Sequence, residues 1–466
     1  MRREMMIFFF TMAIMMCGMY PALAAKSAGF KLPPFQKFSL KNGLTVYLME
    51  QHEVPMIYVS MVFPAGAIKD GDQHGLALLT AENLLFGTQN YTKKQLEEQL
   101  DYLGASYRSS AFKEYAEIKL SFLNDDQDKI FPILQDIVMQ PIFDSDEFDK
   151  HKQRRLDQID LMKEHPVKVI RSYYDKFLFG DHIYGNSLTG DKESVATLTT
   201  TDIKEFYRKN YQPAQSAIAV VGDFKSSQMK KDIQKLFAEW ENDNTPMKPD
   251  VEAPPEINDS RLLLINKDDA TETRFMIGGF GITRSNPDYI PVQVINTILG
   301  GRFTSWLNDE LRVNRGLTYG AHSYFVAHRY SGIFAMSSYT RTEKTEEAID
   351  VTLEVLNRLH KQGVNEETLT SARNYIKGQF PPQYETAGDL ADLLTDMFVY
   401  DFDESFINNF QQNVDEMTVE KAGQIIDKYF PASDLQFVLI GKSDEIRDIV
   451  KKYGELSEKE IKADGF

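Results

Sequence analysis

Apolar residues follow two different periods along this chain, one typical of strands and one typical of helices. Residues 116–141 begin with alternating apolar and polar positions and continue as an amphipathic helical pattern. Residues 332–359 show the same succession. Strands and helices in this order predict an α+β fold, in which largely antiparallel sheets are covered by helices.

The pattern occurs twice, once in each half of the chain. Both halves contain an amphipathic helix, an aromatic residue, Pro-Ala and an apolar strand that ends in Gly. At a constant offset of 218 residues, Thr200, Tyr211, Pro213 and Ala214 match Thr418, Tyr429, Pro431 and Ala432. Gly222 and Gly441 match after a one-residue slip. The fixed order of the matched elements favours duplication over chance similarity between two α+β domains. We therefore expect two homologous lobes that face each other across a groove.

Composition places the boundary between the lobes. Residues 241–259 contain four prolines and many charges, which is typical of an extended linker. The N-terminal lobe is then predicted over 36–240 and the C-terminal lobe over 260–460.

The first 24 residues predict an export signal. They combine a basic start, an apolar core and small residues before a cleavage position after Ala24 or Ala25. The alternative is a membrane anchor, but the apolar run is short for a bilayer and no later run is apolar enough to span one. We expect a periplasmic or secreted protein without stable membrane insertion.

Net charge narrows the class of partner. The formal charge of -17 argues against nucleic acid or an anionic membrane as the main partner, because phosphate binding requires clustered Lys and Arg.

Residues 75–88, GLALLTAENLLFGT, have the apolar spacing of a helix. The segment resembles the first-lobe active-site helix of the pitrilysin/insulinase zinc peptidases, which reads Gly-Leu-Ala-His-x-x-Glu-His and continues to a Gly-Thr. In such a helix, two His one turn apart bind zinc and the Glu is the general base. The resemblance covers nearly the whole chain after the signal segment and implies the two-lobed fold of that family.

The residues that the resemblance assigns to zinc chemistry are replaced here. The first His position is Leu78, the catalytic Glu position is Ala81 and the second His position is Glu82. The remaining ligand of the family comes from a Glu-Glu pair, which falls on Asp157 and Gln158. We therefore expect no zinc site and no cofactor in this chain.

Histidines elsewhere offer no substitute for the missing ligands. His74 lies one turn before Leu78, but none of the eight histidines pairs with another at a spacing of four residues. Each histidine is expected to be a surface or hydrogen-bonding residue.

The second half carries a different motif of the same family. Gly300 and Gly301 precede a helix predicted over 302–314, with Phe303, Trp306, Leu307 and Leu311 inward, and a strand predicted over 317–325. The run resembles the second-lobe substrate motif of the family, in which an Arg and a Tyr seven residues later face the zinc.

That resemblance assigns the two roles to Arg312 and Tyr319, with Arg315 as a competing assignment. A Tyr hydroxyl donates a hydrogen bond to the oxyanion of a tetrahedral intermediate, and a guanidinium holds a substrate carbonyl or carboxylate. The alternative is a surface Arg and a partly buried Tyr with no catalytic role.

The two motifs together suggest half of an enzyme. In part of the family, one chain carries the zinc helix and a second carries the Arg and Tyr. The resemblance thus implies an exported, non-zinc subunit of a heterodimeric metallopeptidase that cleaves unfolded peptides. Its partner would be a homologous subunit that carries the zinc. The alternative is a noncatalytic scaffold or peptide-binding protein of the same fold.

Overall fold

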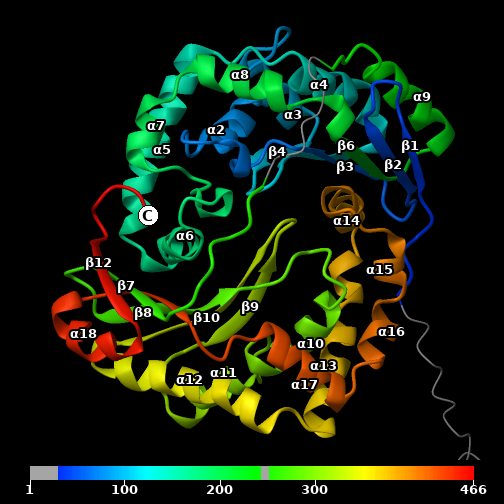
Figure 1. Ribbon diagram of the computed structural model, residues 1–466. Helices are drawn as coiled ribbons and strands as arrows, with labels where there is room; N and C mark the ends of the chain where they lie inside the picture. The colour runs from blue at the N-terminus through cyan, green and yellow to red at the C-terminus, as the bar shows by residue number, and fades with distance from the viewer. Residues whose placement is uncertain (1–29, 243–250) are drawn as a thin grey trace, which may run out of the picture.

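The computed structural model describes residues 30–242 and 251–466. The predicted signal peptide, residues 1–24, lies outside the described residues, as does much of the predicted linker. The described linker residues, 241–242 and 251–259, form neither helix nor strand. The α+β prediction is confirmed, because helices surround two six-stranded sheets (Figure 1).

The first sheet is built from the N-terminal half of the chain. Its order is β1-β2-β6-β3-β5-β4. The strands are β1 (Gln36–Ser39), β2 (Thr45–Glu50), β3 (Met56–Phe63), β4 (Ser106–Ala111), β5 (Ala116–Leu123) and β6 (Ala217–Gly222).

The second sheet has the order β12-β7-β11-β8-β10-β9 and comes from the C-terminal half. Its strands are β7 (Arg261–Asn266), β8 (Glu272–Phe280), β9 (His322–Ala327), β10 (Gly332–Arg341), β11 (Gln436–Gly441) and β12 (Glu455–Glu460).

Five strands of each sheet follow the same plan. β2 pairs in parallel with β6 in the first sheet, and β7 pairs in parallel with β11 in the second. The other neighbours among the five strands are antiparallel. The sixth strand differs between the sheets. β1 precedes β2 along the chain and pairs with it antiparallel, whereas β12 follows β11 along the chain and pairs with β7 in parallel. The shared order is what the sequence repeat predicts.

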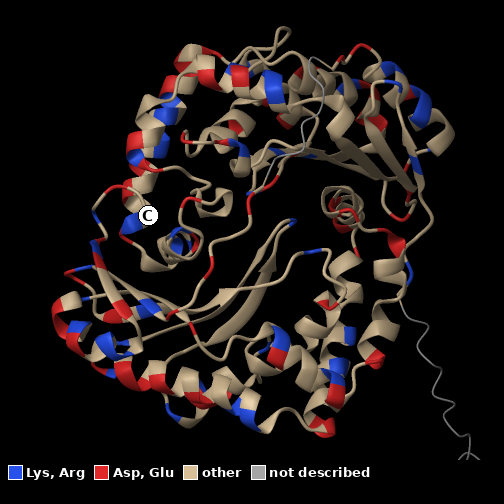
Figure 2. Cartoon of the chain, in the orientation of Figure 1, with Lys and Arg blue, Asp and Glu red and all other residues tan. Residues whose placement is uncertain are grey.

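Helices cover the outer faces of both sheets, and many of the charged residues belong to these outer helices (Figure 2). Every residue of β6 and β11 is buried, because helices cover both faces of the strands. The helices of the first half are α2 (Leu76–Asn83), α3 (Lys93–Tyr102), α4 (Gln127–Met139), α5 (Ser145–Lys163), α6 (Pro166–Phe179), α7 (Lys192–Thr197), α8 (Thr200–Asn210) and α9 (Ser226–Leu236). Those of the second half are α10 (Tyr289–Leu299), α11 (Trp306–Asn308), α12 (Thr345–Gln362), α13 (Glu366–Gln379), α14 (Ala387–Tyr400), α15 (Glu404–Asn408), α16 (Phe410–Asp415), α17 (Val419–Tyr429) and α18 (Ser443–Val450).

The two halves exchange one helix each. α6, from the first half, packs on β8 and β11 of the second sheet, and α14, from the second half, packs on β3 and β6 of the first sheet (Figure 1). Tyr174 of α6 donates a hydrogen bond to the carbonyl of Phe334 at 3.3 Å. Asp392 of α14 pairs with Lys119 of β5 at 3.0 Å. Neither half therefore has a complete core without a helix from the other half.

The helix predicted over residues 75–88 is shorter in the structure. α2 ends at Asn83, and the chain then becomes extended at Gly87 and Thr88, which form bridges with Thr92 and Pro141. Gly87 has a φ of 129°, a backbone conformation that favours glycine.

The helix predicted over residues 302–314 begins later than expected. A turn carries the chain to Ser305, and α11 is followed by a π-helix over Asp309–Asn314. Leu307 and Leu311 are buried as predicted, but Phe303 is 63% exposed because it precedes the helix. Gly316, with a φ of 61°, follows the end of this segment.

The strand predicted over residues 317–325 also begins later, at His322. The hydroxyl of Thr318 accepts a hydrogen bond from the Gly320 N–H at 3.2 Å. This local bond competes with strand pairing and holds residues 317–321 as a loop. Tyr319 therefore lies on a loop before the strand, and the prediction that placed it on a strand is wrong.

Candidate functional site

α2 is buried on nearly all sides. Leu78 is 7% exposed and Ala81 is fully buried within the core of the first lobe. The carbonyl of Ala81 accepts a hydrogen bond from the Ser109 hydroxyl of β4 at 2.6 Å, which fixes the helix against the edge strand of the sheet. At two of the three zinc-helix positions, apolar side chains thus complete a packed core.

Glu82, at the third position, forms an ion-pair cluster with α5. Its two carboxylate oxygens lie 2.7 and 2.6 Å from the same guanidinium nitrogen of Arg155. His151 Nε2 lies 2.7 Å from Glu82 Oε2. The side chains of Arg155, His151 and Glu82 are 9%, 16% and 25% exposed, so the cluster is largely screened from water.

These residues do not fit a zinc ion. Leu78 and Ala81 have no ligand atom, and a guanidinium already neutralises the one carboxylate. Burial raises the pKa of Glu82, but the hydrogen bond with His151 and the charge of Arg155 outweigh burial and hold the pKa below its usual range. An ionised carboxylate with both oxygens bound is a poor general base. Among the described residues, no group of three or more His, Cys, Asp or Glu side chains is arranged to bind a metal.

Asp157 and Gln158 lie on the exposed side of α5. Asp157 accepts a hydrogen bond from Gln153, and neither residue contacts Glu82. The structure places Arg155 and His151 opposite α2 instead. The spacing of histidines does not reveal this pair, because only one of its two members is a histidine. His151 and Arg155 are four residues apart, a spacing that puts both on one helix face and that could have revealed them.

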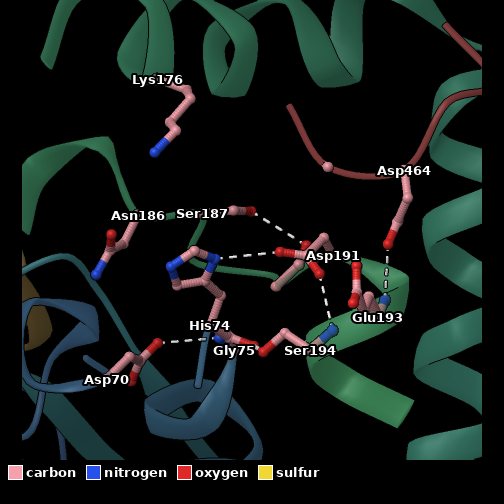
Figure 3. Close-up of polar contacts among 12 residues, drawn as sticks. Asp70, His74, Gly75, Lys176, Asn186, Ser187, Asp191, Glu193, Ser194 and Asp464 are labelled. Atoms are coloured by element: carbon pink, nitrogen blue, oxygen red, sulfur yellow. Dashed lines mark hydrogen bonds and ion pairs between the residues drawn. The ribbon is translucent and has the colours of Figure 1, made fainter. Parts of the chain in front are cut away.

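His74 lies at the loop that leads into α2, and its ring turns toward α7 (Figure 3). Its Nδ1 is 3.1 Å from Asp191, which also accepts a hydrogen bond from the Ser194 N–H at the start of α7. The hydrogen bond with His74 lowers the pKa of Asp191, although burial opposes the change. Asp70 caps α2 by accepting from the Gly75 and Ala77 N–H groups. His74 is thus a hydrogen-bonding residue that ties two helices together, as predicted.

Arg312 and Arg315, the two candidates in the second lobe, have different surroundings. Arg315 forms an ion pair with Glu354 of α12 at 3.1 Å. The guanidinium of Arg312 lies 4.6 Å from the ring centre of Phe303 and, within the described part of the chain, has no carboxylate partner. Of the two, Arg312 is the one whose charge is available to a ligand.

Tyr319 is 83% exposed, but the loop that carries it is firmly held. Ser338 and Thr340 of β10 donate hydrogen bonds to the carbonyls of Gly320 and Leu317 at 2.9 and 2.8 Å. The loop therefore presents a free phenol on a fixed backbone. Phe303 and Val313 are also more than half exposed, so apolar side chains are exposed beside Arg312, which contacts Phe303 and directly precedes Val313 in the same helical segment.

Two family models match the chain. Residues 45–192 match the model described as insulinase (peptidase family M16), and residues 197–376 match the model described as the peptidase M16 inactive domain. The first match contains α2 and α5, and the second contains Arg312 and Tyr319.

Curated relatives cover most of the chain at low identity. An uncharacterized zinc protease of Mycobacterium leprae is 24% identical over 88% of this chain and 93% of its own length. An uncharacterized zinc protease of Bacillus subtilis is 21% identical over 74% of this chain and 83% of its own. A protein named a non-peptidase homolog, from Helicobacter pylori, is 24% identical over 84% of this chain and 90% of its own.

Solved structures share the whole fold. The peptidase M16 inactive domain from Pseudomonas fluorescens superposes with a TM-score of 0.83, at 27% identity, over 88% of this chain and 98% of that one. A protease from Helicobacter pylori superposes with a TM-score of 0.82, at 21% identity, over 88% of this chain and its whole length. Together with the two family models, these likenesses show that the chain belongs to the insulinase family of peptidases, M16, although its first lobe lacks the side chains that bind zinc in the family's active-site helix.

Proposed function

We propose that this chain is the non-zinc subunit of an exported, two-chain metallopeptidase. The observation that carries the proposal is the contrast between the two motifs. The zinc-helix positions are occupied by core residues and an ion pair, whereas Tyr319 is exposed on a fixed loop and Arg312 has no carboxylate partner among the described residues. A homologous partner would supply zinc and its activated water.

The two side chains have separate roles in this proposal. The Tyr319 hydroxyl donates a hydrogen bond to the oxyanion that forms when water attacks a peptide carbonyl. Arg312 holds a carbonyl or carboxylate of the substrate with its planar guanidinium. β9, an edge strand of the second sheet, begins three residues after Tyr319, so an unfolded peptide that adds to this edge would pass the phenol.

Cellular location is part of the same proposal. The N-terminal signal pattern favours a periplasmic or secreted protein. No helix in the described ranges has the length and apolar character needed to cross a bilayer.

The test is reconstitution with the homologous zinc-carrying chain of the same organism. We expect the mixture to cleave a fluorogenic peptide and each chain alone to be inactive. Tyr319→Phe should lower turnover about a hundredfold, because one oxyanion donor contributes roughly 3 kcal/mol. Assembly should be unchanged in size-exclusion chromatography. Parental turnover by the Tyr319→Phe complex would exclude the catalytic role.

The second candidate function is a noncatalytic scaffold or peptide-binding subunit. It is favoured by the relative named a non-peptidase homolog and by the exposed apolar side chains Phe303 and Val313 beside Arg312. In that case the chain would bind a partner or peptide, and substitution of Tyr319 would change binding without any effect on cleavage.

A further inference from the structure

A cavity of about 830 Å3 lies where the two halves meet, and no residue of either motif contributes to its lining. One end of the first sheet, the turn between α14 and α15, and the hairpin between β9 and β10 form its walls. Its volume is within the range of small-molecule sites. The residues that matter to its chemistry are Lys69, Tyr115, Arg329, Phe398, Phe402 and Phe406.

One part of the lining is aromatic. Tyr115, Phe398, Phe402 and Phe406 are each partly exposed, and each packs at its back against the hydrophobic core. Phe402 and Phe406 are held further by the guanidinium of Arg284, which lies 4.5 and 4.4 Å from their ring centres. The aromatic side chains are therefore fixed, and their exposed surface can receive an apolar group without rearrangement.

The lining contains three cations, Lys37, Lys69 and Arg329, and none of them forms an ion pair within the described residues. Lys37 lies 5.3 Å from the ring centre of Tyr47. Lys69 ends the short helix Ala67–Lys69 and is partly buried. Burial lowers the pKa of its amine, and the positive charge of Lys209 lowers it further. Arg329 is exposed, and its guanidinium lies 6.0 Å from the ring centre of Tyr330. A partly buried ammonium without a counter-ion is unfavourable, and an anion bound in the cavity would relieve that cost.

Two carboxylates of the lining, Glu114 and Asp403, accept hydrogen bonds from other residues of the chain. Glu114 accepts from the Tyr184 hydroxyl at 2.5 Å and from the Arg329 N–H at 2.9 Å. Asp403 accepts from the Ser405 hydroxyl and from the Ser405 N–H, and these bonds, with the nearby charge of Lys37, lower the pKa of Asp403. Asp401 is exposed to solvent. Lys37 has Asp403 nearby, whereas the Lys69 ammonium and the Arg329 guanidinium form no ion pair with a carboxylate of the described residues.

We propose that this cavity binds a carboxylate joined to an apolar or aromatic body, with the carboxylate at Lys69 and Arg329 and the apolar body against Tyr115, Phe398, Phe402 and Phe406. The C-terminal residue of a peptide and a free fatty acid both have this chemistry. The site uses neither Arg312 nor Tyr319 and does not depend on the proposed peptidase function.

The experiment is isothermal titration of the full chain with three probes at about 1 mM. The probes are N-acetyl-Leu-Phe with a free carboxylate, the same dipeptide as its amide, and decanoate. Lys69→Met removes the charge and keeps an unbranched side chain. Lys231→Met removes an exposed lysine on α9 and is the matched control. Protection of Lys69 from acetylation, measured by mass spectrometry, reports occupancy in the unmodified protein.

We expect at least one carboxylate probe to bind and to protect Lys69, and Lys69→Met to weaken that binding about tenfold or more. Binding of the dipeptide acid but not its amide supports the proposal and identifies a peptide terminus as the source. Binding of decanoate alone supports it with a fatty acid as the source. Three results would overturn it: no binding of either carboxylate, equal binding of acid and amide, or parental affinity in Lys69→Met. The acid and amide comparison needs no variant, so misfolding of Lys69→Met cannot obscure the outcome.

Discussion

The guanidinium of Arg155 lies 2.6 Å from the carboxylate of Glu82, at the place where the resemblance to the family puts the second zinc ligand. A fixed organic cation on α5 therefore stands close to where a metal cation would be bound. This ion pair explains how α2 stays packed in the first lobe without zinc. Of the three zinc-helix positions, Glu82 has the opposite charge of Arg155 beside it, and Leu78 and Ala81 are apolar.

Restoring zinc binding should require removal of Arg155. The triple variant Leu78→His, Ala81→Glu, Glu82→His carries the residues of the family's helix but keeps the guanidinium. Adding Arg155→Glu should raise zinc affinity by at least tenfold, because a carboxylate replaces a repelling cation. Adding Gln158→Glu instead is the matched control, since Gln158 lies on the exposed side of α5. Equal zinc affinity of the triple and quadruple variants, measured by competition with a chelator, would contradict this geometry.

The Glu82 cluster should make stability depend on acid pH. Because the folded-state pKa of Glu82 is below its usual range, its contribution is complete above about pH 4.5 and is lost as pH falls through the lower folded value. Glu82→Gln should cost about 2 kcal/mol of unfolding free energy near pH 7. Urea denaturation should show the difference between parent and variant shrinking from pH 5 to pH 3. A difference that does not change with pH would count against the ion pair.

Substitutions of Arg312 and Arg315 should have different effects on kcat/KM of the reconstituted peptidase. Arg312→Met removes a guanidinium that has no carboxylate partner in the described part of the chain, and it should lower kcat/KM by about tenfold to a hundredfold. Arg315→Met breaks only a surface ion pair with Glu354 and should change kcat/KM less than about twofold. Steady-state cleavage of a fluorogenic peptide measures both. Equal losses in the two variants would show that general positive charge, rather than the position of Arg312, matters.

The C-terminal segment should stabilise the first lobe through Asp464. Its carboxylate accepts from the N–H groups of Lys192 and Glu193 at 3.0 and 2.8 Å, at the start of α7 (Figure 3). Asp464→Ala should lower the free energy of unfolding by about 1 kcal/mol, because two helix N–H groups lose their acceptor. Hydrogen exchange at residues 192 and 193 should accelerate. Asp448→Ala, which removes an exposed carboxylate on α18, should leave both measurements near the parental values.

The sequence was sufficient for the features that depend on residue type and local period. Strand alternation, the repeat and its order of elements predicted the two matching sheets, because burial of one face imposes that pattern on the chain itself. The sequence also determines that positions 78 and 81 supply no zinc ligand, since neither the Leu78 nor the Ala81 side chain has an atom that can bind a metal.

Contacts between distant segments were decided only by the tertiary structure. Arg155 meets Glu82 across 73 residues of chain, and its position opposite α2 depends on how α5 packs. The same holds for the different surroundings of Arg312 and Arg315, because the ion pair of Arg315 with a carboxylate on α12 joins residues 39 positions apart. The exchange of α6 and α14 between the halves likewise follows from which apolar faces remain uncovered once both sheets have formed. Local pattern specifies that a face is apolar, but only the packed chain determines which segment covers it.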